Sequence, residues 1–227
     1  MISVKARLCA RIESVSSLSP PQGNLENHMR PTEMLSADHR VIEQVLECLE
    51  KLAHAASSGR GLDLERGNTV LEFLSMFADR LHHGKEEGLL FPMLQARGMA
   101  ENVGPIAVML NEHDLGRSEL ARLRKALAAV DPAGFASAAS AYVELLRDHI
   151  AKEDGVLFQM AEDRFSDVDR QCLVAEFDRA DRNQLGSGVR DRLVESANSL
   201  AGSLGVPFGA SRSQAPRSRS CSLWPCP

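Results

Sequence analysis

The chain contains the stretch HHGKEEGLLF at residues 82–91 and a close copy of it, HIAKEDGVLF, at residues 149–158. In each copy a histidine stands four residues before a glutamate: His82 and Glu86 in the first, His149 and Glu153 in the second. Residues four apart lie on the same face of an α-helix. Two such helices facing each other would bring two imidazoles and two carboxylates together. The repeat therefore indicates the beginning of a two-metal site.

The fold follows from the spacing of apolar residues on either side of the repeat. That spacing predicts four long helices, at residues 32–56, 64–97, 103–129 and 132–163. Asp131-Pro132 is a helix start signal, and a shorter fifth helix at 166–181 is expected to cover one end of the bundle. No strand pattern is found. We predict an all-α protein, an antiparallel up-down-up-down four-helix bundle with a short C-terminal fifth helix.

The predicted bundle domain covers residues 32–185, with a different kind of sequence on each side. Residues 1–31 are expected to be disordered, and one hypothesis is that translation begins at Met29 and the preceding residues are not part of the protein. Residues 186–227 are rich in Gly, Ser, Arg and Pro. That composition predicts a disordered basic tail.

Composition limits the classes of function. The 227 residues carry a formal net charge of −5, with the negative charge concentrated in residues 30–185, so nucleic-acid binding is not expected. No apolar run approaches the roughly 20 residues of a membrane span. The first residues, MISVKARLCARIESV, lack the apolar core of a signal peptide. The five cysteines form no C-x-x-C pair, which favours reduced thiols and a cytoplasmic protein.

Each of the four long predicted helices carries a histidine in its apolar stripe. A single histidine in such a stripe is usually a core residue with satisfied hydrogen bonds, but four at matching depth, beside two inward glutamates, would be costly to bury without metal ions. Imidazole and carboxylate ligands suit first-row divalent metals, iron above all, and carboxylates can bridge two cations. The predicted metal ligands are His39, His82, Glu86, His113, His149 and Glu153.

The neighbours of these ligands are given other roles. For His83, Glu87 and Asp154 we expect a solvated helix face or a hydrogen bond to a metal ligand. Lys85 and Lys152 are expected to be solvated.

Three glycines near the ligands, Gly88, Gly116 and Gly155, interrupt the helical pattern. Glycine inside a helix costs about 1 kcal/mol relative to alanine. The glycines therefore indicate either close packing of helices or an opening for a small ligand, and the sequence does not choose between the two.

The combined motifs resemble the hemerythrin-like (HHE cation-binding) family over residues 32–165. The resemblance rests on ADHR at residues 37–40, LLFPML at 89–94 after the first copy of the repeat, NEHD at 111–114, and the second copy. It implies the same four-helix bundle. It also implies that the six predicted ligands hold two non-haem iron ions, bridged by the glutamates and by an oxo or hydroxo group.

One departure from the family bears on function. Oxygen-carrying hemerythrins have a second histidine four residues after the first on the third helix, where this chain has Arg117, which cannot bind a cation. Their bridging acid on the fourth helix is an aspartate five residues after the histidine. With one histidine fewer, more than one coordination position would be open, which argues against simple reversible oxygen carriage. The pattern is closer to bacterial hemerythrin-like proteins and to the di-iron domain of iron–sulfur-cluster repair proteins.

Our first hypothesis is a non-haem di-iron protein that binds or senses O2, NO or peroxide. No separate acid–base residue is identified, so a metal-binding protein is favoured over a dedicated enzyme. The alternatives are a di-iron enzyme of peroxide or NO detoxification or of iron–sulfur cluster repair, an iron-storage or iron-responsive interaction module, and a structural zinc site. The expected partner is a small diatomic or peroxidic ligand, not a nucleic acid or a membrane.

Overall fold

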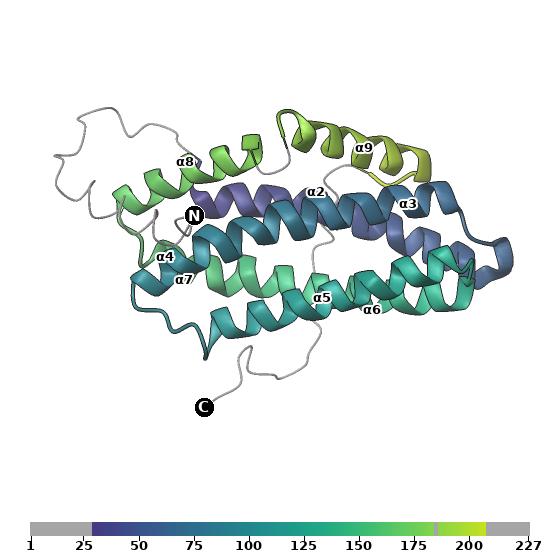
Figure 1. Ribbon diagram of the computed structural model, residues 1–227, viewed down its shortest axis with the longest axis horizontal. Helices are drawn as coiled ribbons and strands as arrows, with labels where there is room; N and C mark the ends of the chain where they lie inside the picture. The colour runs from purple at the N-terminus through teal and green to yellow at the C-terminus, as the bar shows by residue number, and fades with distance from the viewer. Residues whose placement is uncertain (1–28, 184–185, 208–227) are drawn as a thin grey trace.

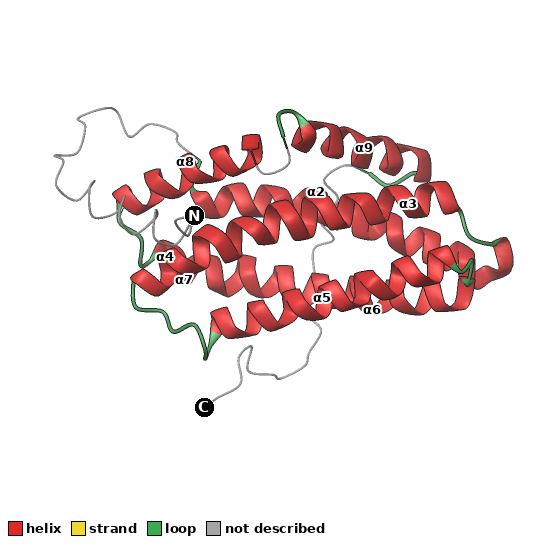
Figure 2. Ribbon diagram, viewed as in Figure 1, coloured by secondary structure: helices red, strands yellow, loops and turns green. Residues whose placement is uncertain are grey.

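The computed structural model of the protein describes residues 29–183 and 186–207. Within these residues all regular structure is helical (Figure 2). The elements are α2 (Pro31–Ala55), η1 (Ala56–Arg60), α3 (Leu64–Phe73), η2 (Leu74–His83), η3 (Glu86–Leu90), α4 (Phe91–Ala96), α5 (Pro105–Ala128), α6 (Pro132–Lys152), η4 (Glu153–Leu157), α7 (Phe158–Glu162), α8 (Asp167–Asn183) and α9 (Val189–Leu204). Elements labelled η are π-helical. The predicted all-α class is confirmed.

The helices begin where the sequence signals place them. Asp131 precedes α6 and its side chain accepts a hydrogen bond from the Gly134 N–H at 3.0 Å, while Pro132 occupies the first helical turn. Asp63 plays the same part for α3, accepting from the Arg66 N–H at 3.0 Å. These caps satisfy amide groups that a helix start leaves without partners. The five predicted helices agree with the observed boundaries to within about two residues.

Long helical segments lie side by side along the molecule (Figure 1). One is α2. The second runs without a break from α3 through η2 and η3 to α4, the third is α5, and the fourth runs from α6 through η4 to α7. Helix α5 packs on α6, and α2 packs on both α6 and α9. Helices α8 and α9 lie together along one side of the long segments (Figure 1).

Two hydrophobic clusters fill the interior, and a polar layer separates them. The larger cluster lies beside the loops that join α2 to α3 and α5 to α6, and it contains Ile42 and Leu81. The smaller cluster lies toward α4, α7 and α8, and it contains Leu35 and Leu89. His39 stands in the sequence between Leu35 of the smaller cluster and Ile42 of the larger one. The histidine of α2 is therefore at the level where the two apolar clusters meet.

Both copies of the sequence repeat contain a π-helical stretch at equivalent positions. In η3 the N–H of the following residue, Phe91, donates to the carbonyl of Glu86, and in η4 the N–H of Phe158 donates to the carbonyl of Glu153. These bonds span five residues instead of the four of an α-helix, so each turn is wider. π-Helical turns inside α-helices are frequent at functional sites. The repeated sequence thus encodes a local backbone geometry as well as a pair of ligands.

The prediction that residues 186–227 form a disordered tail is wrong for residues 189–204, which form α9. Leu193, Ala197 and Leu200 recur every three or four residues, and their side chains are buried in the larger hydrophobic cluster. This amphipathic spacing outweighs the Gly and Ser content on which the prediction rested. Residues 208–227, and residues 1–28 of the predicted N-terminal extension, lie outside the described residues.

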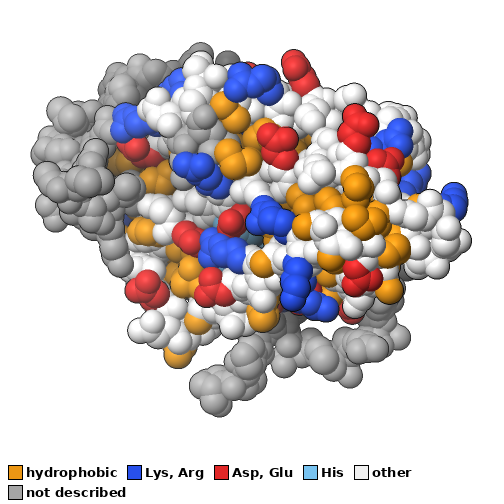
Figure 3. All heavy atoms as spheres, turned by 45° about the vertical axis from the view of Figure 1, so that its right-hand side comes forward, with side chains coloured by type: hydrophobic (Ala, Val, Ile, Leu, Met, Phe, Trp, Pro, Cys, Tyr) orange, Lys and Arg blue, Asp and Glu red, His pale blue; other side chains and the backbone are white. Residues whose placement is uncertain are grey.

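The outside of the molecule carries charges of both signs. Lys and Arg side chains are interspersed with Asp and Glu over the face shown in Figure 3. Among the helices that the structure describes, none is long and apolar enough to cross a membrane.

Candidate metal centre

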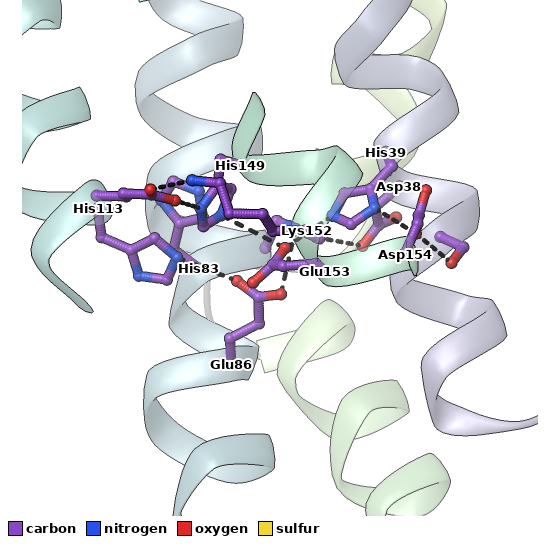
Figure 4. A network of polar contacts seen from close by, with 12 residues as sticks. Asp38, His39, His83, Glu86, His113, His149, Lys152, Glu153 and Asp154 are labelled. Carbon is purple, nitrogen blue, oxygen red and sulfur yellow. Dashed lines mark hydrogen bonds and ion pairs between the residues drawn. The ribbon is translucent and has the colours of Figure 1, made fainter. Parts of the chain in front are cut away.

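The six predicted ligands come together in the polar layer between the long helices. Figure 4 labels five of them, His39, Glu86, His113, His149 and Glu153. Their donor atoms fall into two groups, and within each group all donor atoms lie within 4.8 Å of one another. One group is His39, His82, Glu86 and Glu153, and the other is His83, Glu86, His113 and His149. Glu86 belongs to both groups, so the two candidate positions for a metal ion are adjacent.

The two glutamates lie between histidines of the two groups. Glu86 Oε1 is 3.5 Å from His82 Nε2, and Glu86 Oε2 is 3.4 Å from His113 Nε2. Glu153 Oε2 is 3.2 Å from His39 Nε2 and 3.4 Å from His149 Nε2. Each carboxylate therefore reaches from one group to the other, as a bridging ligand must.

The burial of these groups shows that the arrangement needs a further partner. Thirteen buried side-chain nitrogen and oxygen atoms of the described residues have no hydrogen-bond partner, and ten of the thirteen belong to this cluster. They include both carboxylate oxygens of Glu86 and of Glu153, and the Nε2 atoms of His39, His113 and His149. Buried polar atoms are normally satisfied, because each unsatisfied one costs roughly 1–3 kcal/mol. Imidazole nitrogen with carboxylate oxygen is a donor set that suits iron and its neighbours, so these residues fit metal ions.

His83 is a member of the cluster that the sequence prediction missed. It was expected on a solvated face or in a hydrogen bond to a ligand, but its side chain is 4% exposed and its ring stacks on His113, with centroids 3.9 Å apart. In an α-helix the neighbouring positions 82 and 83 differ by about 100° around the axis. The π-helix η2, which ends at His83, has a wider turn and lets both consecutive histidines point inward. The doubled histidine in the first copy of the repeat was the available signal.

The cluster contains five histidines, His39, His82, His83, His113 and His149. In each of them a carboxylate faces Nδ1, the ring nitrogen referred to here as the outer one. The Nδ1 atoms of three of them are within hydrogen-bond distance: His39 to Asp154 at 2.9 Å, His113 to Glu87 at 2.7 Å and His149 to Glu112 at 3.1 Å. His82 and His83 have longer contacts, 3.6 Å to Asp38 and 3.7 Å to Asp79. A carboxylate can only accept, so in the first three the hydrogen sits on Nδ1 and Nε2 is left to bind a metal.

Of the two expectations for Glu87 and Asp154, the structure shows the hydrogen bond to a predicted ligand, His113 and His39 respectively. The sequence prediction missed Asp38, Asp79 and Glu112. Asp38 and Glu112 each directly precede a predicted ligand, His39 and His113, which was the only local signal.

Each of these outer carboxylates is in turn bound by a cation. Arg40 pairs with Asp154, and Lys152 pairs with Glu112. Arg117 donates to Glu87 at 2.6 Å and to Asp79 at 2.7 Å. This arginine, at the position where the oxygen carriers have a histidine, thus holds the carboxylates behind His113 and His83.

The prediction that Lys85 is solvated is wrong, and Lys152 is also only partly exposed. Lys85 is 1% exposed, and its Nζ donates to Asp38 at 2.6 Å. It stands three residues after His82, so it lies on the same buried side of the helix, and the ion pair with Asp38 compensates for the loss of water. Lys152, with 18% of its side chain exposed, is held at Glu112.

The electrostatics of the centre combine burial with close carboxylates. Burial lowers the pKa of His39, but the hydrogen bond to Asp154 and its other carboxylate contacts raise it overall to about 10. Burial also lowers the pKa of His113, but the contact with Glu86 and its other carboxylate contacts raise it overall to about 9. The pKa of His83 is well below its ordinary value, because burial and the neighbouring His113 both oppose a charge on it. A metal ion must displace the protons of the first two imidazoles to bind.

The three glycines near the ligands do not serve close packing. A Cβ atom added at Gly88, Gly116 or Gly155 would meet no heavy atom within 4 Å beyond its own local helix backbone. Gly116 is nevertheless buried. Of the two interpretations left open by the sequence, the structure removes close helix packing.

Comparison with known proteins agrees with this geometry. The family model of the hemerythrin HHE cation-binding domain matches residues 30–161. Two proteins described as uncharacterized, Mb2018 of Mycobacterium bovis and Rv1995 of Mycobacterium tuberculosis, are each 23% identical to this chain over 180 residues, which cover 77% of this chain and 70% of theirs. No solved structure gives a significant match. The family model spans more than half of the chain and includes every residue of the cluster, so the chain belongs to the hemerythrin HHE cation-binding domain family.

Proposed function

We propose that this protein holds two non-haem iron ions in the cluster and binds a small diatomic or peroxidic ligand there. The observation that carries the proposal is the pair of donor groups that share Glu86 and leave ten buried atoms without hydrogen bonds. His83, His113 and His149 would hold one ion, His39 and His82 the other, with Glu86 and Glu153 between them. We also propose that the long helical segments form the antiparallel up-down-up-down bundle of the family.

The donor set supports a site that also accepts an outside ligand. One group offers three imidazoles and the other only two, so seven protein side chains serve two ions. First-row metals of this kind commonly take more ligands than these side chains supply. Iron held by these residues would supply the redox chemistry. The surrounding protein supplies a buried site flanked by two apolar clusters, which limits the access of water.

The outer carboxylates and cations have a separate task in this function. They hold the imidazole rings in one tautomer and one orientation, so the site is formed before a metal arrives. The open space beside Gly116 is a candidate path or pocket for a ligand of two or three atoms, because alanine would fit there and yet glycine is present.

The proposal is tested by anaerobic reconstitution of the full chain with Fe2+, followed by titration with O2, NO or H2O2. We expect about two iron ions per chain and new charge-transfer absorption bands on addition of at least one ligand. If no iron binds, the metal part of the proposal fails. If iron binds but the spectrum does not respond to any of the three, the ligand part fails. Steady-state turnover of peroxide or NO in the same preparation would show an enzyme instead of a binding protein.

A further inference from the structure

The carboxylate behind His82 is held from a distant part of the chain. Asp38 is fully buried, and its Oδ2 lies 3.6 Å from His82 Nδ1. Lys85 Nζ donates to the same oxygen at 2.6 Å. Arg190 Nη2 donates to the other oxygen, Oδ1, at 2.7 Å. Arg190 belongs to α9, which lies outside the residues matched by the family model.

Helix α8 contributes to the same group of charges, of which Asp38 and Lys85 are buried and Arg190 is partly exposed. Asp181 Oδ1 is 3.2 Å from Lys85 Nζ, and Asp181 Oδ2 is 3.4 Å from Arg190 Nε. The Arg190 guanidinium also lies over the ring of Phe77, 5.6 Å from its centroid. Two carboxylates and two cations are thus assembled beside the metal centre from four separate segments. A buried carboxylate left without its cations would be strongly destabilised, which makes Asp38 dependent on both of them.

We propose that Arg190 is a positioning residue for the metal centre. Together with Lys85 it fixes the Asp38 carboxylate against His82, so that the last described helix determines how tightly the His39–His82 group holds its metal ion. The inference rests on the proposed metal binding, but it concerns a different residue and a different helix. Loss of this support should weaken one ion selectively, because the other group is backed by Asp79, Glu87 and Glu112.

The competing explanation is that α9 only packs on the bundle. The opposite end of α9 provides a matched control for it, because Lys51 Nζ donates to the carbonyls of Leu204 and Gly205 at 2.9 Å each. Lys51→Ala removes two hydrogen bonds that dock α9 without touching Asp38. Arg190→Gln removes the charge at Asp38 while keeping most of the side-chain stem.

The test is a titration of metal-free, full-length protein with Co2+ in the presence of a competing chelator, followed by the absorbance of bound Co2+. We expect two equivalents in the wild type. In Arg190→Gln one Co2+ equivalent should bind about 10-fold more weakly, and the affinity of the other should be unchanged. Loss of a residue that holds a ligand histidine in place typically has an effect of this size. Arg190→Lys should recover only part of the loss, because it keeps the charge but has a single, shorter donor. Lys51→Ala should leave both equivalents within about twofold of the wild type.

Several outcomes overturn the proposal, and they are distinguishable. If Arg190→Gln binds both Co2+ equivalents with the affinities of the wild type, the proposal is refuted, but metal binding itself is not. An equal, selective loss in Lys51→Ala shows that docking of α9, and not the charge on Asp38, is responsible. A wild type that binds no Co2+ and no iron removes the proposed function as well. If circular dichroism shows that Arg190→Gln does not fold, Arg190→Lys is used for the test. Its single, shorter donor should weaken the binding of the same Co2+ equivalent measurably. Wild-type affinity for both equivalents in Arg190→Lys would also refute the proposal.

Discussion

Replacement of His83 by leucine separates the role of a metal ligand from that of a core residue. Leucine is apolar, has a comparable volume and cannot bind a metal. In metal-free protein His83 carries a buried Nδ1 without a hydrogen-bond partner. Removing such a group relieves a desolvation cost of roughly 1–3 kcal/mol. We therefore expect the metal-free His83→Leu protein to be at least as stable as the metal-free wild type.

The metal-bound protein should show the opposite effect. A ligand that binds only the folded state at 100 times its Kd adds about 2.7 kcal/mol to the free energy of unfolding. If loss of His83 raises the Kd of one ion on the order of 100-fold, that contribution falls to about 0.4 kcal/mol at the same metal concentration. The loss of about 2.3 kcal/mol corresponds to a fall in Tm of about 5–9 °C for a chain of this size.

Thermal unfolding followed by circular dichroism, with and without Co2+, measures both effects. His54→Gln serves as the control, because His54 is exposed near the end of α2 and should leave both melting temperatures unchanged. The decisive quantity is the gain in Tm on adding metal. If His83→Leu shows the same metal-induced rise in Tm as the wild type and binds two Co2+ ions as well, His83 is not a ligand. The wider turn of η2 then has no part in metal binding.

Three further changes have expected results. Gly116→Ala should raise the free energy of unfolding by about 0.5–1 kcal/mol, because the methyl group meets no atom and alanine favours the helix. The same change should slow the binding of NO to the iron-loaded protein, measured by stopped flow. An unchanged rate would exclude the space at Gly116 as the path of entry. Asp169, in the first turn of α8, accepts from the Ser166 N–H at 2.9 Å and binds Arg97 at 2.9 and 2.6 Å. Burial raises its pKa, but these hydrogen bonds lower it overall below the ordinary value. Its stabilising contribution is therefore present above the ordinary pKa of about 3.8 and is lost as the pH falls through the lowered pKa. Asp169→Asn should cost roughly 1–3 kcal/mol at pH 7 in urea unfolding, and the difference from the wild type should shrink toward zero in acid; a difference independent of pH would contradict the charge argument. Leu200→Ala should lower the free energy of unfolding by about 2–5 kcal/mol in urea unfolding if α9 is part of the folded domain. A decrease below about 0.5 kcal/mol would show that the packing of α9 does not stabilise the bundle.

The parts of the molecule that the sequence predicted are those set by local spacing. Helix boundaries followed from apolar residues three and four apart and from caps such as Asp131. Four of the six candidate ligands were predicted because His82 and Glu86, and their copies His149 and Glu153 in the repeat, are four residues apart on one helix. His39 and His113 then followed from their places in apolar stripes. All of these signals lie within a few residues along the chain.

The parts that were missed depend on partners far apart in sequence or on backbone geometry that departs from the α-helix. Asp38 and Arg190 are 152 positions apart, and nothing near either residue indicates the other. Lys85 was expected in water because lysine usually is, and only its buried partner explains its place. Helix α9 was missed because its Gly and Ser content was given more weight than the spacing of Leu193, Ala197 and Leu200. Gly205, in the left-handed conformation that ends the helix, was a usable stop signal.

The missing histidine at position 117 takes on a different meaning once His83 is counted. The sequence alone suggested a centre with one imidazole fewer than that of the oxygen carriers, and from this an extra open position. The structure restores five imidazoles by turning His83 inward, and it uses Arg117 to hold Glu87 and Asp79 behind two of them. The number of histidines therefore no longer separates this centre from an oxygen carrier. The surrounding layer of charges is then the feature to test: Arg117 donates to Glu87 and Asp79, and Arg190 donates to Asp38. Substitutions in that layer are a more direct way to determine the reaction than a count of ligands.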